Sequence, residues 1–120
     1  MSKKQVNVHV GTLEDMGRRF TRAWKQVERG EKMREEHLTF PDLAALLNAL
    51  SPKRVQLLRA VHQEPARSIK ALAERLKRDY KRVHEDVETL AELGLLQRND
   101  GRVATTYDVI HADLDLRSAA

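Results

Sequence analysis

The sequence predicts a mainly helical α+β fold, and three observations support that prediction. Apolar residues recur at helical spacing through the middle of the chain. Alternating apolar residues mark one short strand near each end, at residues 6–10 and 110–116. Near residue 100 the turn sequence Asn-Asp-Gly separates two further segments of strand character. Since 120 residues suffice for one modest hydrophobic core, we expect a single compact domain.

Composition restricts the class of protein. The formal net charge of +4 is moderate, although the basic excess is centred on residues 53–82. Cysteine is absent, which excludes disulfides, thiolate chemistry and zinc-finger sites. No apolar run approaches the roughly 20 residues of a membrane helix, and the N-terminal residues lack the apolar core of a signal peptide. We therefore expect a cytoplasmic protein that has no membrane partner.

Residues 1–50 are predicted to form a supporting and dimerising region. After the strand at residues 6–10, Thr12 and Asp15 make a capping box that opens a helix ending at Gly30. The apolar stripe of this helix comprises Leu13, Met16, Phe20, Trp24 and Val27. A stripe at this spacing is far more often a core or a dimer interface than a ligand site.

Two further helices are predicted before residue 65. Residues 31–37 are polar and predict a connector, after which Thr39 with Asp42 gives a second capping signal. The short helix that follows is lined by Leu43, Leu46, Leu47 and Leu50. Ser51 and Pro52 open the next helix, which Pro65 prevents from continuing beyond Glu64. Its apolar positions are Val55, Leu57, Leu58, Ala60 and Val61.

The stretch from Ser68 to Gly94 predicts two helices joined by a tight polar turn. Ser68 and Asp79 are suitable N-caps, and Gly94 supplies the left-handed residue that ends the second helix. The two apolar stripes comprise Ile69, Leu72, Ala73 and Leu76, and then Val83, Val87, Leu90 and Leu93. Because these stripes can pack against each other, we interpret the segment as a helix-turn-helix.

The residues outside these stripes indicate a nucleic-acid-binding surface. Four side chains on the first turns of the second helix are candidates for reading base edges: Tyr80, Lys81, Arg82 and His84. Six more residues are candidates for contacts to the phosphate backbone: Arg67, Ser68, Lys70, Arg75, Lys77 and Arg78. A run of charges is usually a solvated helix face, so the helix pair alone leaves both interpretations open.

Beyond Gly94 the pattern changes from helical spacing to strands. Residues 95–98 and 102–106 flank a turn in which Asp-Gly readily adopts the positive φ angles of a tight hairpin. We interpret residues 95–106 as a wing, from which Arg102 reaches the DNA backbone or minor groove. The final alternation predicts a strand over Ile110–Leu116 that pairs with residues 6–10, within one subunit or across a dimer.

The order of elements over residues 51–106 resembles a winged-helix domain of the MarR-like type. The runs LTFPDLAALLNALSPKRVQLLRAV, SIKALAERLKRDYKRVHEDVETLAELGLL and YDVIHADLDL resemble a family of small MarR-like transcriptional regulators, some of them antitoxin-like. The resemblance covers nearly the whole chain and is most specific in RDYKRVHEDV. It implies a DNA-binding protein with the four candidate base-reading residues in its recognition helix.

The full prediction is a winged helix-turn-helix with an N-terminal strand-helix extension. Residues 1–50 provide support, residues 51–106 bind DNA, and residues 107–120 form the C-terminal strand. We expect a sequence-specific, double-stranded DNA-binding transcriptional regulator, with helix 79–93 in the major groove. A homodimer is expected because apolar surface remains on residues 13–27 and on the terminal strands.

Two other classes of function have less support from the sequence. A protein-interaction module of the antitoxin-like kind, with a toxin protein as partner and weak or secondary DNA binding, is the alternative, because a winged fold does not by itself prove DNA binding. An enzyme is not expected: the five histidines lie on different predicted elements without metal-ligand spacing, and no Gly-rich phosphate loop is present. We therefore expect no metal and no cofactor.

Overall fold

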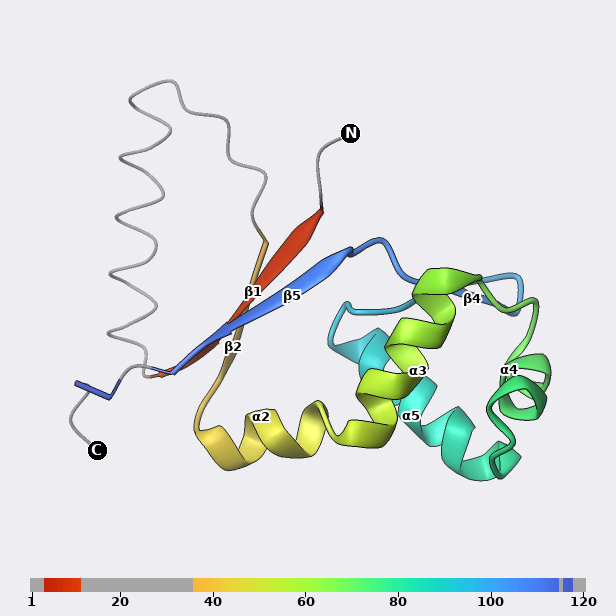
Figure 1. Cartoon of the computed structure of the whole chain (residues 1–120), viewed down its shortest axis with the longest axis horizontal. Helices are drawn as coiled ribbons and strands as arrows, with labels where there is room; N and C mark the ends of the chain where they lie inside the picture. The colour runs from red at the N-terminus through yellow and green to blue at the C-terminus, as the bar shows by residue number, and fades with distance from the viewer. Residues whose placement is uncertain (1–3, 12–35, 115, 118–120) are drawn as a thin grey trace, which may run out of the picture. The chain divides into compact units, whose positions relative to one another are not determined.

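The computed structural model describes residues 4–11, 36–114 and 116–117, which form an α+β fold. They contain helices α2 to α5 and strands β1 to β5 (Figure 1). The chain divides into two compact units, Met1–Leu46 with Val109–Ala120, and Leu47–Asp108. None of the helices in these described residues is long and apolar enough to cross a membrane. The helix predicted at residues 12–30 lies outside them.

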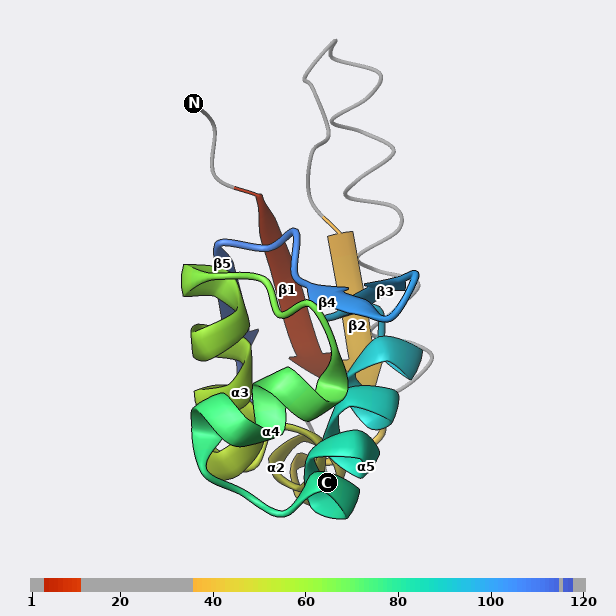
Figure 2. The same ribbon diagram turned by 90° about the vertical axis from the view of Figure 1, so that its right-hand side faces the viewer.

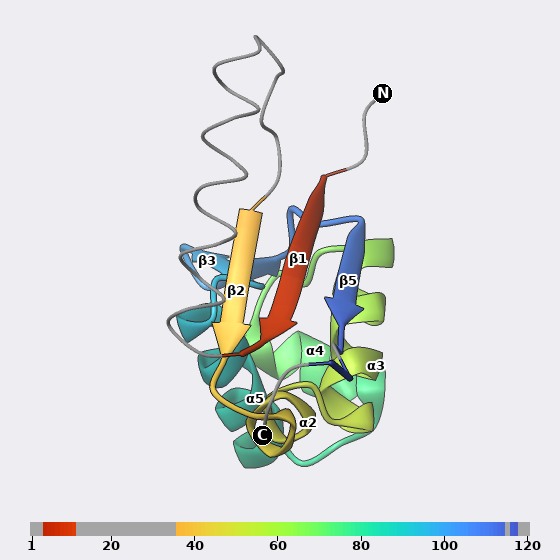
Figure 3. The same cartoon turned by 90° about the vertical axis from the view of Figure 1, so that its left-hand side faces the viewer.

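The first unit contains a three-stranded sheet (Figure 3). Strand β1 (Gln5–Val10) is central, with β2 (Glu36–Phe40) on one side and β5 (Val109–Asp113) on the other. Both pairings are parallel, and Val8 of β1 lies opposite Leu38 of β2 and Ala112 of β5. The predicted pairing of the two terminal strands is therefore confirmed, and it occurs within one chain.

The C-terminal strand is shorter than predicted. It ends at Asp113, and the prediction that it reaches Leu116 is wrong. Asp113 pairs with His9 in the last pairing between β5 and β1. Leu114 and Leu116, which continue the apolar alternation in the sequence, are 53% and 89% exposed.

The polar connector predicted at residues 31–37 is wrong for its last two residues. Glu36 and His37 begin β2, an edge strand whose charged residues concealed its alternation. Thr39 consequently lies in β2, so the cap of α2 (Leu43–Ala49) is Asp42, whose Oδ1 accepts a 2.8 Å hydrogen bond from the Ala45 N–H. Of the leucines predicted to line this helix, Leu46 is buried, whereas Leu43 and Leu47 are exposed.

The second unit contains three helices and a hairpin (Figure 2). These are α3 (Pro52–Gln63), α4 (Ile69–Leu76), α5 (Tyr80–Glu92), β3 (Gln97–Asn99) and β4 (Arg102–Ala104). The N-caps predicted for these three helices are confirmed, because the side chains of Ser51, Ser68 and Asp79 each accept a hydrogen bond from the N–H three residues later. Glu64 is the C-cap of α3, directly before Pro65.

Every element of the second unit except β3 contributes buried side chains. They include Leu57, Leu58, Val61, Ile69, Leu72, Ala73, Val83, Val87, Leu90, Leu95, Leu96 and Val103. Burying one such valine or leucine stabilises the fold by roughly 1.5–3 kcal/mol relative to leaving it exposed. The apolar stripes predicted on α4 and α5 thus face the core, and the opposite face of each helix is left to solvent.

Candidate nucleic-acid interface

A short turn determines where α5 begins. Lys77 adopts a left-handed backbone conformation with φ of 55°, and its N–H bonds to the carbonyl oxygens of Ala73 and Glu74. The N–H of Arg78 also donates to Ala73, at 3.0 Å. These bonds satisfy carbonyls that the end of α4 would otherwise leave unpaired. Asp79 then caps α5, with its Oδ2 3.3 Å from the N–H of Arg82.

The first turn of α5 presents three exposed side chains. Tyr80, Lys81 and Arg82 are exposed, whereas Val83 and Val87 on the other face are fully buried. Within the described residues the Arg82 guanidinium makes no hydrogen bond or ion pair, so its five donors are available to a ligand. Three of the four predicted base-reading residues therefore share one exposed helix end.

The fourth, His84, is half-buried and has partners on its own helix. Its Nε2 lies 3.5 Å from Oε1 of Glu88, at the four-residue spacing that places two side chains on one helix face. Its ring centroid lies 5.8 Å from that of Tyr80. His84 is thus close to the exposed end, but it is less accessible than Arg82.

The exposed charge changes sign along α5. Lys81 and Arg82 lie in the first turn, and the later turns expose Glu85, Glu88 and Glu92. The N-terminal end of a helix also carries partial positive charge from the aligned peptide dipoles, which the Asp79 carboxylate partly offsets. A polyanion is therefore attracted to the start of α5 and repelled by its later turns.

The guanidinium groups of Arg75 and Arg78, two of the six predicted backbone-contact residues, donate hydrogen bonds within the protein. Arg75 donates to carbonyl oxygens at the end of α3, those of Ala60 at 3.2 Å, Glu64 at 2.7 Å and Pro65 at 3.3 Å. Arg78 donates from Nη2 to Asp86 Oδ2 at 2.8 Å, and its side chain is only 15% exposed. Sequence spacing could not reveal these acceptors, because they come from other elements.

The other four predicted backbone residues remain at the surface. Arg67, Lys70 and Lys77 are exposed. Ser68 is half-buried, and its Oγ accepts the Ala71 N–H at 3.0 Å, which leaves the hydroxyl proton to donate elsewhere. These residues lie at the start and at the end of α4.

A backbone bridge attaches the hairpin to the segment before α4. Ala66 and Val103 exchange two hydrogen bonds, of 2.9 and 2.8 Å. Asp100 and Gly101 both have positive φ, 52° and 82°, as the predicted hairpin turn requires. A Cβ added to Gly101 would lie 4.0 Å from the carbonyl oxygen of Arg67. The tip of the hairpin and the exposed Arg67 are therefore neighbours.

The hairpin exposes two arginines. Arg102 is exposed, as its predicted role requires, and it pairs with Asn99 across the turn. Arg98, which lies opposite Val103, is exposed as well. Sequence reasoning named only Arg102, although a second cation one residue before the turn was a visible signal for Arg98.

The histidines lie beside another histidine or an acidic residue. His9 Nε2 lies 2.9 Å from His37 Nδ1, and His62 Nε2 lies 2.9 Å from Asp108 Oδ1. Among the residues that the structure describes, no group of three or more His, Asp or Glu side chains could hold a metal ion.

These elements define a small α+β protein with cations exposed on the start of one helix and on a hairpin. The chain belongs to the HVO_A0114 family, whose model matches residues 49–112. The match covers more than half of the chain and runs from the end of α2 through the hairpin into β5. No curated protein and no solved structure matches the chain.

Proposed function

We propose that this chain is a winged helix-turn-helix protein that binds double-stranded DNA sequence-specifically and regulates transcription. One observation carries the proposal: Lys81 and Arg82 are exposed at the start of a helix whose opposite face is core. A surface helix end with available cations fits the major groove, which admits an α-helix.

The winged form of the proposal is supported by the order of elements. Helices α4 and α5 are joined by a turn, and a hairpin follows within the same unit. The isolated antiparallel bridge between Ala66 and Val103 adds one further backbone pairing to that hairpin. This bridge holds the proposed wing against the segment that leads into α4.

The charge along α5 favours one orientation on DNA. The helix enters the groove with its first turns, because Glu85, Glu88 and Glu92 would meet the phosphates if it lay flat along the groove. Arg82 can bond guanine O6 and N7 with two parallel donors. Tyr80, Lys81 and His84, the other three residues proposed to read bases, lie within the same two turns of the helix.

The phosphate contacts come from both sides of α5 in the sequence. Arg67, Ser68, Lys70 and Lys77 precede it, and Arg98 and Arg102 of the wing follow it. Such contacts fix the register of the protein on the duplex without carrying sequence information themselves.

Fluorescence anisotropy with labelled duplexes, first selected from a random pool, tests this function. Five of the proposed phosphate-contacting residues are cations, and a dimer carries each of them twice. A protein that makes six to ten phosphate contacts loses roughly 10³- to 10⁵-fold in affinity between 50 and 200 mM salt, so we expect a decrease in that range. The double variant Lys81→Ala, Arg82→Ala should lose preference for the selected duplex. Absence of binding at low salt, or binding that ignores salt, would contradict the proposal.

The antitoxin-like alternative is favoured by a different observation. Leu43 and Leu47 of α2 are 40% and 59% exposed and lie one helical turn apart. Exposed leucines at this spacing suit the apolar groove of a partner protein. A stable complex with a toxin protein, lost in Leu47→Glu while DNA binding is kept, would support this second role.

A further inference from the structure

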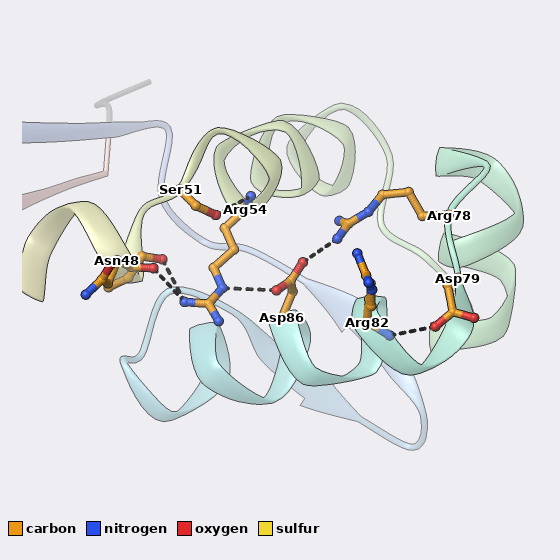
Figure 4. Close-up of polar contacts among 8 residues, drawn as sticks. Asn48, Ser51, Arg54, Arg78, Asp79, Arg82 and Asp86 are labelled. Atoms are coloured by element: carbon orange, nitrogen blue, oxygen red, sulfur yellow. Dashed lines mark hydrogen bonds and ion pairs between the residues drawn. The ribbon is translucent and has the colours of Figure 1, made fainter.

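Asp86 is the acid at the centre of a mostly buried charge cluster (Figure 4). Its Oδ1 accepts a hydrogen bond from Arg54 Nε at 3.0 Å, and its Oδ2 accepts one from Arg78 Nη2 at 2.8 Å. The exposed fractions of these side chains are 21% for Arg54, 15% for Arg78 and 14% for Asp86. Two cations therefore share one carboxylate.

The two arginines differ in what else holds them. Arg54 also donates from Nη1 to the carbonyl oxygens of Asn48 at 2.9 Å and Ala49 at 3.4 Å, so it caps the C-terminal end of α2. The Nη1 of Arg78, in contrast, is buried and has no hydrogen-bond partner among the described residues. Asp86 is the one described acceptor that retains the Arg78 guanidinium.

Arg78 occupies the turn between α4 and α5, next to the exposed Lys77. In a helix-turn-helix bound to DNA, this turn lies close to the phosphate backbone. A guanidinium that is buried without a counter-charge is strongly unfavourable. Loss of the Asp86 carboxylate should therefore drive Arg78 into solvent, where phosphates can attract it.

We propose that Asp86 limits the sequence-independent DNA affinity of this chain by holding Arg78 away from the phosphates. This role rests on the proposed DNA-binding function. An added phosphate contact strengthens binding to every duplex by about the same factor, because it reads no base. Asp86 is accordingly a positioning residue that lowers occupancy of the many non-specific sites in a genome.

The test compares the wild-type chain with Asp86→Asn, which keeps the shape of the side chain and removes its charge. We expect tighter binding to selected and scrambled duplexes alike, by up to roughly eightfold per chain at 0.1 M salt. The salt slope, which is the slope of log K for DNA binding against log salt concentration, should become steeper by about 0.9. The double variant Asp86→Asn, Arg78→Gln should return to the wild-type slope. Glu92→Gln removes one carboxylate from an exposed position on the same helix and should leave the slope unchanged.

Arg78→Gln alone decides the proposal if Asp86→Asn fails to fold. It should leave the wild-type slope unchanged, since Arg78 contacts no phosphate while Asp86 holds it. A salt slope that is shallower by about 0.9 in Arg78→Gln would overturn the role of Asp86. If the wild-type chain binds DNA but Asp86→Asn has an unchanged slope, only this role fails. If the wild-type chain binds no duplex, the proposed function fails with it.

Discussion

Three arginines within eight residues illustrate how pairing separates side chains that are equivalent in the sequence. Arg75 donates to three main-chain carbonyls and Arg78 to a carboxylate, whereas the Arg82 guanidinium has no partner within the described chain. An arginine with internal acceptors must give up those bonds before it can bind a ligand. Of the three, Arg82 is therefore the one whose guanidinium is available to a ligand.

Arg82→Ala should weaken binding to the preferred duplex by about 1–3 kcal/mol and remove base preference at one position in each half-site. Lys70→Ala, an exposed change on α4, should instead weaken all duplexes equally and reduce the salt slope by about 1. Titrations of both variants against selected and scrambled duplexes distinguish the two effects. An unchanged specificity ratio in Arg82→Ala would place the recognition face elsewhere.

Arg75→Ala should affect stability and not DNA binding. The change removes hydrogen bonds to the end of α3, so we expect the free energy of unfolding to fall by about 1 kcal/mol. The salt slope should equal that of the wild type. Arg59→Ala, on the exposed face of α3, is the control for loss of a surface arginine. Urea denaturation measures the free energy of unfolding. A reduced salt slope in Arg75→Ala would show that Arg75 contacts phosphate.

At the scale of elements, caps and turn residues determine most boundaries. The N-caps of α3, α4 and α5 each use a short oxygen-bearing side chain, and the hairpin turn uses Asp100 and Gly101 at positive φ. For residues other than glycine the left-handed conformation is unfavourable, because Cβ approaches the following carbonyl oxygen. Replacing Gly101 therefore acts on the backbone, since nothing lies closer than 4.0 Å to a Cβ at that position.

Gly101→Ala should lower the free energy of unfolding by about 1–2 kcal/mol and also weaken the proposed DNA binding, because the hairpin loses its turn. Gly94→Ala is the matched control: its φ of 81° is nearly the same, and no atom lies within 4 Å of the added Cβ. Gly94→Ala should lose a similar amount of stability, but its affinity for DNA should be unchanged at a temperature where both variants are folded. Equal affinity losses in the two variants would exclude a specific role for the wing.

At the scale of the whole molecule, the candidate interface belongs entirely to one unit. Every residue assigned to DNA contact lies within Leu47–Asp108, whereas the parallel sheet draws its strands from the other unit. The sheet pairs β1 with β5, two strands that are far apart in the sequence. The first unit therefore contributes no residue to the proposed DNA contacts.

We predict a symmetric dimer that binds two half-sites about one helical turn apart, because a single recognition helix reads only a few base pairs. The helix expected at residues 13–27 and Trp24 in particular supply the predicted interface, although they lie outside the described residues. Light scattering at micromolar concentration measures the oligomeric state, and titration of a selected duplex measures the number of chains bound to each site. A monomer mass together with one chain per binding site would refute the dimer.

The sequence alone determined the features that depend on neighbouring residues. The starts of α3, α4 and α5, the end of α3 before Pro65 and the hairpin turn were all predicted correctly. Each depends on a hydrogen bond or a backbone angle within about four residues, so the local residue types suffice to specify it.

The features that join distant segments follow from the three-dimensional packing and are not visible in the sequence. The order β2-β1-β5, the bridge from Ala66 to Val103, and the partners of Arg75 and Arg78 all link residues that are far apart or on different elements. Short polar strands such as β2 carry little signal of their own, because pairing with a neighbour stabilises them more than intrinsic propensity does. An arginine likewise looks the same in a sequence whether it will meet solvent, a carbonyl or a carboxylate. Its partner depends on tertiary packing, which brings together groups that are far apart in the sequence.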